Sequence, residues 1–136
     1  MFNIGLVARK SGDGELIANW NFRNQEGWLL GTGWQIHDGL YAQKSSGTAS
    51  ALEWVFPTAL PPGSYALTVV TRSRTGGLFI PRILRSSGLL NSGSSQTSAG
   101  TYVFNTPISD GIAAVLIDAN SLFNGTISSL SLKRTA

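Results

Sequence analysis

Cysteine is absent from this sequence of 136 residues, and charged residues make up only 12% of it. The lack of cysteine excludes disulfide bonds, thiolate metal sites and thiol catalysis. No apolar run approaches the roughly 18 residues that a membrane-spanning helix needs. The start of the chain also lacks the long apolar run of a signal peptide. We therefore expect no membrane partner and no secretion through a signal peptide.

Positive charge is also sparse: ten Lys and Arg against seven Asp and Glu give a net charge of +3. Most of these residues are scattered, whereas nucleic-acid binding usually requires a dense basic patch with interleaved aromatic residues. We therefore expect no nucleic-acid partner. The low overall charge suggests that a partner covers part of the surface, because soluble domains are usually about one-quarter charged.

Short apolar runs separated by turn signals dominate the sequence, and no window shows a convincing helical period. The run YALTVV, residues 65–70, is apolar on one face and nearly so on the other. Strands that are apolar on both sides, with no helices to cover them, suggest a two-sheet sandwich or a buried outer face. The sequence therefore predicts an all-β fold, an antiparallel two-sheet β-sandwich over residues 15–136, preceded by a short N-terminal arm, residues 1–14.

Four dipeptides favour tight hairpin turns, because their residues readily adopt positive φ angles. They are Asp38-Gly39, Gly76-Gly77, Asp110-Gly111 and Asn124-Gly125. The predicted hairpins pair 33–37 with 40–43, 66–72 with 78–84, 102–106 with 112–118, and 114–122 with 126–133. We expect two further strands at 16–22 and 52–56, a proline-rich rim loop at 57–63, and a long loop at 86–100 with Leu89 and Leu90 on the core.

A series of motifs in a fixed order resembles a known family. The motifs are Asn19-Trp20-Asn21-Phe22, Gly27-Trp28, Gly33-Trp34, Pro62–Tyr65, Gly100–Tyr102 and Gly125–Lys133. Over roughly residues 15–134 the chain resembles the jelly-roll β-sandwiches, similar to carbohydrate-binding modules, that recur in bacteriophage virion and tail proteins. The resemblance implies a jelly roll but leaves function open, because this fold has many roles.

Carbohydrate-binding relatives often hold a structural calcium through an acidic residue of the first-strand motif and an aspartate of the last strand. The matching positions here are Asn21 and Ser128, and neither supplies the carboxylate that calcium favours. We therefore expect no bound metal and no cofactor.

The tryptophans allow two interpretations. Trp28 and Trp34 could stack on a sugar ring, or they could belong to the core beside glycine turns, as buried aromatic residues commonly do. Trp20 and Trp54 are less typical of the family pattern. They are the better candidates for a ligand or a partner interface.

The sequence gives little support for catalytic activity. The sole histidine, His37, precedes Asp38, but the Asp-Gly turn explains that aspartate without chemistry. Glycosidases need two converging carboxylates. Of the seven acidic residues only Glu53 and Asp118 fall in strand-like runs, and nothing indicates that they converge. We expect that the protein is not an enzyme.

Four arginines, Arg72, Arg74, Arg82 and Arg85, surround the predicted hairpin at Gly76-Gly77. Guanidinium groups suit carboxylates, phosphates and aromatic faces at interfaces. The hairpin is therefore either a contact for an acidic partner or a solvated tip.

Two functional hypotheses follow. The first is a non-enzymatic bacteriophage structural protein, a capsid decoration or cement protein or a tail or fibre component. It would be assembled into the virion in the host cytoplasm and would bind other virion proteins and copies of itself, with a trimer expected from virion analogy. The alternative is a carbohydrate-binding or host-receptor-binding module for a host glycan. In that module Trp28, Trp34, Tyr41, Trp54 and Arg72 would line an exposed face or cleft.

Overall fold

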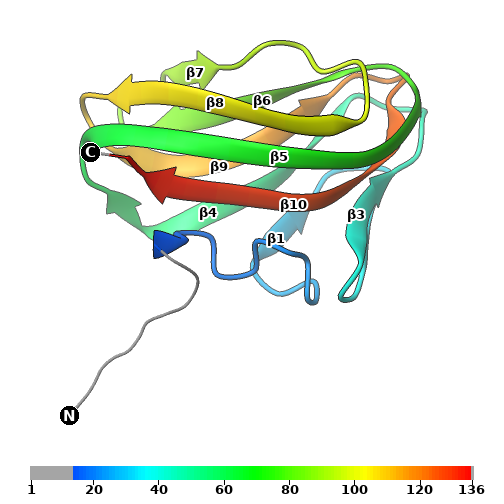
Figure 1. Cartoon of the computed structure of the whole chain (residues 1–136), viewed down its shortest axis with the longest axis horizontal. Coiled ribbons are helices and arrows are strands. Elements are labelled where there is room, and N and C mark those ends of the chain that lie inside the picture. Colours follow the sequence, from blue (N-terminus) through cyan, green and yellow to red (C-terminus); the bar gives the residue numbers. More distant parts are fainter. Residues whose placement is uncertain (1–13, 136) are drawn as a thin grey trace.

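The computed structural model describes residues 14–135, which form a sandwich of two antiparallel β-sheets (Figure 1). Sheet I has the strand order β1-β4-β9-β6-β7, and sheet II has the order β2-β3-β10-β5-β8. The strands are β1 (Trp28–Leu30), β2 (Trp34–His37), β3 (Tyr41–Lys44), β4 (Ser50–Leu60), β5 (Gly63–Gly76), β6 (Phe79–Arg85), β7 (Leu90–Ser92), β8 (Gly100–Ile108), β9 (Ile112–Ala119) and β10 (Asn124–Arg134). The predicted all-β jelly-roll sandwich is confirmed.

Within residues 14–135 no helix is long and apolar enough to cross a membrane. The arm predicted for residues 1–14 lies outside the described residues except for Gly14. The domain limits therefore remain a prediction from the sequence.

The core lies between the sheets and is built from alternating positions of the long strands. Leu67 of β5 pairs in register with Leu132 of β10, and both are fully buried. From sheet I, Ile83 and Ile117 are equally buried. Burying each such side chain contributes roughly 1.5–3 kcal/mol, so the two inner faces hold the sandwich together.

Only one of the four predicted hairpins is correct. The turn at Asp38-Gly39 joins β2 to β3, which pair in sheet II. At Gly76-Gly77 and Asp110-Gly111 the chain leaves one sheet and enters the other, from β5 to β6 and from β8 to β9. Asn124-Gly125 forms the start of β10 and not a turn, and the chain crosses from β9 to β10 just before it. The predicted pairings across these three turn signals are therefore wrong.

The connection at Gly77 shows why a turn signal does not specify a hairpin. Gly77 has a φ of 72°, and a Cβ there would collide with the backbone of Phe123. Glycine is needed because the chain passes close to another backbone segment while it crosses between the sheets. A turn dipeptide predicts a change of direction, whereas core packing selects the sheet that the next strand enters.

Two expectations about chain segments are also wrong. The stretch 16–22 forms no named strand but follows the edge of β10, with hydrogen bonds from the Leu16 amide to the Leu132 carbonyl and from the Leu130 amide to the Trp20 carbonyl. The predicted rim loop at 57–63 is largely strand, because β4 continues to Leu60. The pairing of β4 with β9 is irregular between Val55 and Leu60, which accommodates the missing amide of proline.

The stretch 86–100 is mostly loop, as predicted, but it contains the short edge strand β7. Leu89 and Leu90 do not reach the core: they are 60% and 49% exposed. The backbone of β7 pairs with β6 at the edge of sheet I, which points the Leu90 side chain to solvent.

Candidate functional site

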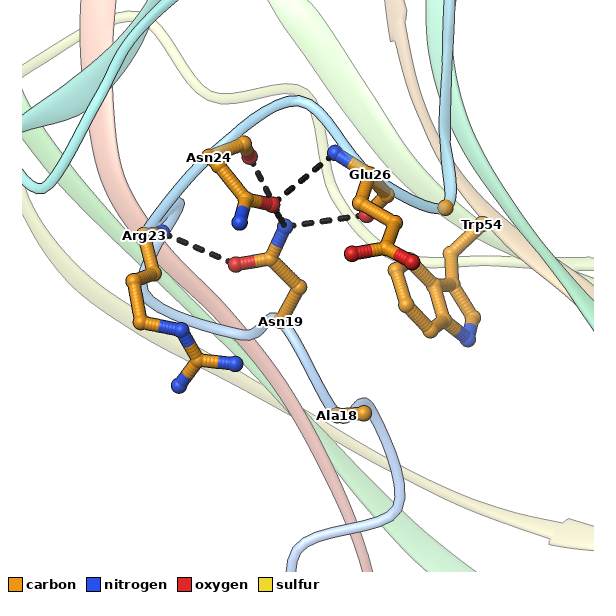
Figure 2. A pocket seen from close by; sticks show the side chains of 7 residues that line it. Ala18, Asn19, Arg23, Asn24, Glu26 and Trp54 are labelled. Atoms are coloured by element: carbon orange, nitrogen blue, oxygen red, sulfur yellow. Dashed lines mark hydrogen bonds between the residues drawn. The ribbon is translucent and has the colours of Figure 1, made fainter.

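One buried side-chain amide organises the turn at residues 19–26. The Asn19 amide nitrogen donates to the main-chain carbonyls of Asn24 (2.8 Å) and Glu26 (2.9 Å) and to the Asn24 Oδ1 (3.1 Å). Its Oδ1 accepts a hydrogen bond from the Arg23 amide (2.8 Å). Asn19 is only 4% exposed, and a buried amide is stable only when its hydrogen bonds are made. The network therefore holds the turn in one shape (Figure 2).

The same turn is anchored to the core by aromatic side chains. Phe22 is fully buried and has a φ of 56°, a region that bulky residues rarely adopt. Its ring lies 4.9 Å from the ring of Trp28. The Trp28 indole donates from Nε1 to the Asn19 carbonyl at 3.0 Å. Such strained backbone persists only where its surroundings hold it, and it often occurs at ligand-binding sites.

Trp54 supplies an aromatic wall beside this turn. It is the register partner of Trp28 across β1 and β4, and the two rings meet edge-on with centroids 5.0 Å apart. Gly27 has a φ of 86°, and a Cβ there would lie 2.5 Å from Cζ3 of Trp54. Glycine at this position lets the indole pack against the turn.

The turn and Trp54 line a surface cavity of about 350 Å³ that is open to solvent. Its lining is one aromatic ring, two amides, one cation, one carboxylate and two small residues: Trp54, Asn19, Asn24, Arg23, Glu26, Ala18 and Gly27. In Figure 2 the side chains of Arg23 and Trp54 stand on opposite sides of Asn19. The cavity thus combines a flat apolar surface with hydrogen-bonding groups of both polarities.

This arrangement is suited to binding. Arg23 and Glu26 are exposed at the rim, where a guanidinium offers donors and a carboxylate offers acceptors. Glu26 is the one carboxylate in the lining, so the cavity lacks the pair of acids that glycosidic hydrolysis uses. Among residues 14–135 no cluster of His, Asp or Glu could hold a metal ion.

Two of the tryptophans predicted as candidates belong to the core. Trp28 and Trp34 are each 6% exposed. The Trp34 ring lies 6.2 Å from that of Phe123, and its Nε1 is 3.5 Å from the Ser50 carbonyl. They do not form an exposed row with Trp54. Trp20 is 39% exposed but lies outside the cavity lining.

The four arginines do not surround one hairpin, because β5 and β6 belong to different sheets. Arg74 donates to the Gly77 carbonyl (2.7 Å) and shapes the connection. On sheet I, Arg82 pairs with Asp118 at 2.9 Å, and Arg85 pairs with Asp110 at 2.8 Å.

Arg72 differs from these three arginines. Its guanidinium carbon lies 5.0 Å above the ring centroid of Tyr41 on the outer face of sheet II. The structure thus brings together two predicted candidates, and it places them apart from Trp54.

The sequence did not single out most of the cavity. In the sequence nothing distinguishes Arg23, Asn24 and Glu26 from ordinary loop residues. Asn19 belongs there to a motif of the family pattern. A closely spaced Asn, Asn and Glu before a Gly-Trp is a weak signal for an ordered turn. The wall at Trp54 comes from a strand much later in the chain, so only the folded structure shows the cavity.

The chain has the fold of carbohydrate-binding modules. TmCBM61, solved with β-1,4-galactotriose, is similar over 90% of this chain and 100% of its own, at 15% identity and a TM-score of 0.62. CBM86, a low-affinity xylan-binding module from Roseburia intestinalis, matches over 79% of this chain and 86% of its own, at 15% identity and a TM-score of 0.59.

Part of a bacteriophage protein has the same fold. The enzymatically active domain of tailspike protein 4 from bacteriophage CBA120 is similar over 89% of this chain, at 15% identity and a TM-score of 0.61. This chain corresponds to 21% of the tailspike chain. No family model matches the sequence, and no curated protein does either.

Proposed function

We propose that this protein is a non-catalytic carbohydrate-binding module whose ligand occupies the cavity beside Trp54. The observation that carries the proposal is the pre-organised turn that sets Arg23, Asn24 and Glu26 around an aromatic wall. Modules of the same fold are described as binding galactotriose and xylan, which supports a saccharide as the ligand.

The chemistry of the cavity favours a sugar ring over an apolar ligand. The Trp54 indole offers a flat apolar surface for the face of a pyranose, while Arg23, Asn24 and Glu26 can hydrogen-bond to hydroxyl groups at its edge. The volume of about 350 Å³ lies near the lower end of the usual range for ligand sites. One or two sugar units are the expected occupant.

The Asn19 network supports binding at low entropic cost. A turn that is already ordered by buried hydrogen bonds loses little further freedom when a ligand arrives. Binding would then proceed without large movement of the turn.

The test is titration with neutral oligosaccharides, followed by tryptophan fluorescence and calorimetry. Trp54→Ala is expected to abolish measurable binding, and Arg23→Ala to weaken it by about tenfold, equivalent to about 1.4 kcal/mol. Trp20→Ala is the matched control, since it removes an exposed indole outside the cavity. Equal loss of binding in the Trp20 and Trp54 variants would contradict this location of the site.

A second candidate function, a structural component of a phage particle, has an observation of its own. An apolar row crosses the outer face of sheet I, where Val55, Ala114, Leu84 and Leu90 are successive register partners. Val55 is 47% and Leu90 49% exposed, whereas Leu84 is half-buried and Ala114 is 1% exposed, so the accessible apolar surface lies at the two ends of the row. Apolar surface of this kind often marks a protein interface. The similarity to a phage tailspike domain supports a virion location, with other virion proteins and copies of this chain as partners.

Light scattering on the full chain tests this second candidate. An oligomer, a trimer by virion analogy, is expected, and the double substitution Val55→Asp with Leu90→Asp is expected to convert it to monomer. Deletion of residues 1–14 is expected to weaken the same assembly without unfolding the sandwich. A monomer at all concentrations would contradict this second candidate, and carbohydrate binding would be the one remaining proposal.

A further inference from the structure

The outer face of sheet II carries a second cluster of polar side chains, away from the cavity. His37 and Tyr41 are register partners on β2 and β3, and their rings lie 4.9 Å apart. A ring nitrogen of His37, Nε2, is 2.8 Å from Oε1 of Gln43. Arg72 reaches this cluster from β5, on the other side of β10.

The position of Arg72 results from a β-bulge. In the pairing of β10 with β5, Thr126 is opposite Ser73 and Ile127 is opposite Thr71, so Arg72 has no partner residue. An extra residue of this kind changes the direction of its side chain. Bulges are also frequent beside functional sites. Here the bulge directs the guanidinium across β10 and over the ring of Tyr41.

The guanidinium of Arg72 has no hydrogen-bond acceptor and no ion-pair partner within residues 14–135, and it stacks on the Tyr41 ring. By contrast, Arg74, Arg82 and Arg85 each donate to a carbonyl or a carboxylate. Stacking on an aromatic ring holds a guanidinium in place while its N–H groups stay available to an anion.

The surroundings of Arg72 favour one anionic group on an otherwise neutral, hydroxyl-rich ligand. Ser73 and Thr126 share a hydrogen bond between their hydroxyl groups at 2.7 Å beside the bulge. Gln35 and Gln43 are register partners on the same face as Tyr41. Amides and hydroxyls match sugar hydroxyl groups, and a single guanidinium fork matches one carboxylate.

We propose that Arg72, stacked on Tyr41, is a binding site for the carboxylate of an acidic sugar, such as a uronic or sialic acid residue of a glycan. This inference rests on the proposed carbohydrate-binding function, but it assigns a separate surface and a ligand class. The carboxylate accepts two hydrogen bonds from the guanidinium, and Gln43 bonds to ring hydroxyls.

The experiment uses the full chain and a panel of acidic oligosaccharides: oligogalacturonate, oligoglucuronate and sialyllactose. Each is paired with its methyl ester, which keeps the shape and removes the charge. At least one acid is expected to bind at least tenfold more tightly than its ester. Arg72→Ala should abolish this preference, and Arg72→Lys should retain part of it, since an ammonium group lacks the planar fork.

Lys133→Ala is the matched control. It removes one positive charge at the opposite end of the same sheet, where Lys133 pairs with Ala66, and it should leave the preference intact. Melting temperatures verify that each variant is folded. The inference is overturned if no acid is preferred over its ester, or if Lys133→Ala reduces the preference as much as Arg72→Ala does.

Two further outcomes distinguish a failure of this inference from a failure of the proposed carbohydrate-binding function. If neutral sugars bind at Trp54 without any preference for acids, the inference fails and the proposed function stands. If no saccharide of either kind binds, both fail. If inorganic phosphate or an acidic peptide displaces the bound acidic sugar as effectively as the free acidic sugar does, Arg72 is a general anion site. That result would overturn the assignment to a sugar.

Discussion

The indole of Trp54 packs directly on the backbone of Gly27, so closely that a Cβ at Gly27 would lie 2.5 Å from Cζ3 of the ring. This contact joins β4 of sheet I to the turn that precedes β1. It also sets the position of the aromatic wall of the cavity. The geometry of this cavity therefore depends on a position without a side chain.

Gly27→Ala should destabilise the fold and displace Trp54. The substitution combines an unfavourable positive φ of 86° with a clash against the ring. Gly39→Ala separates the two effects, because Gly39 has a φ of 75° but open space around it. We expect a loss of about 1 kcal/mol for Gly39→Ala and a distinctly larger loss for Gly27→Ala, measured by denaturant unfolding. Equal losses would mean that the ring moves away freely.

Asn19→Ala should loosen the turn that carries Arg23 and Glu26. The carbonyls of Asn24 and Glu26 and the Arg23 amide would lose their partner, at a cost of about 1–3 kcal/mol for each group that stays buried. Hydrogen exchange of the Arg23 amide should accelerate. Asn21→Ala, at an exposed position of the same turn, is the control, and an equal effect there would contradict a special role for Asn19.

Trp34→Ala should cost about 3–5 kcal/mol of unfolding free energy, as expected for a large side chain removed from a core. Trp34 is 6% exposed, whereas Trp20 is 39% exposed, so Trp20→Ala should cost less. Thermal and denaturant unfolding measure both. An unchanged melting curve for Trp34→Ala, combined with lost sugar binding, would reverse the assignment of Trp34 to the core.

Acidification should remove the contribution that Asp110, in the connection between β8 and β9, makes to the stability of the fold. Hydrogen bonds from Ser87, and then from Arg85, lower the pKa of Asp110 from 3.8 to about 2. The pKa of Asp110 is lower in the folded state than in the unfolded state, so the carboxylate stabilises the protein above pH 3.8. This contribution is lost as the pH falls toward 2.

Asp110→Asn should therefore lower the melting temperature at neutral pH and flatten its decrease between pH 3.8 and 2. Asp38→Asn, at an exposed turn position, is the control. A pH profile in the Asp110 variant identical to that of the native chain would show that other groups carry the acid sensitivity.

The sequence alone was sufficient for the class of fold and for part of the local structure. Alternation at 65–70 predicted a strand, and β5 buries Tyr65, Leu67 and Val69 on its inner face. The opposite face, with Ala66, Thr68 and Val70, is only half-buried. The turn at Asp38-Gly39 predicted the β2–β3 pair. These features depend on side-chain periodicity and on the φ angles that particular residues tolerate, which are local properties.

Only the tertiary structure decided which sheet each strand enters and which distant side chains meet. The chain does change direction at Gly77 and Gly111, which have φ angles of 72° and 109°, whereas Gly125 lies within β10. A tight turn does not determine whether the next strand pairs with its predecessor or crosses the core. The cavity joins a turn to Trp54, and the bulge in β5 aims Arg72 at Tyr41. Both juxtapositions arise from long-range packing and register, which no short window of sequence contains.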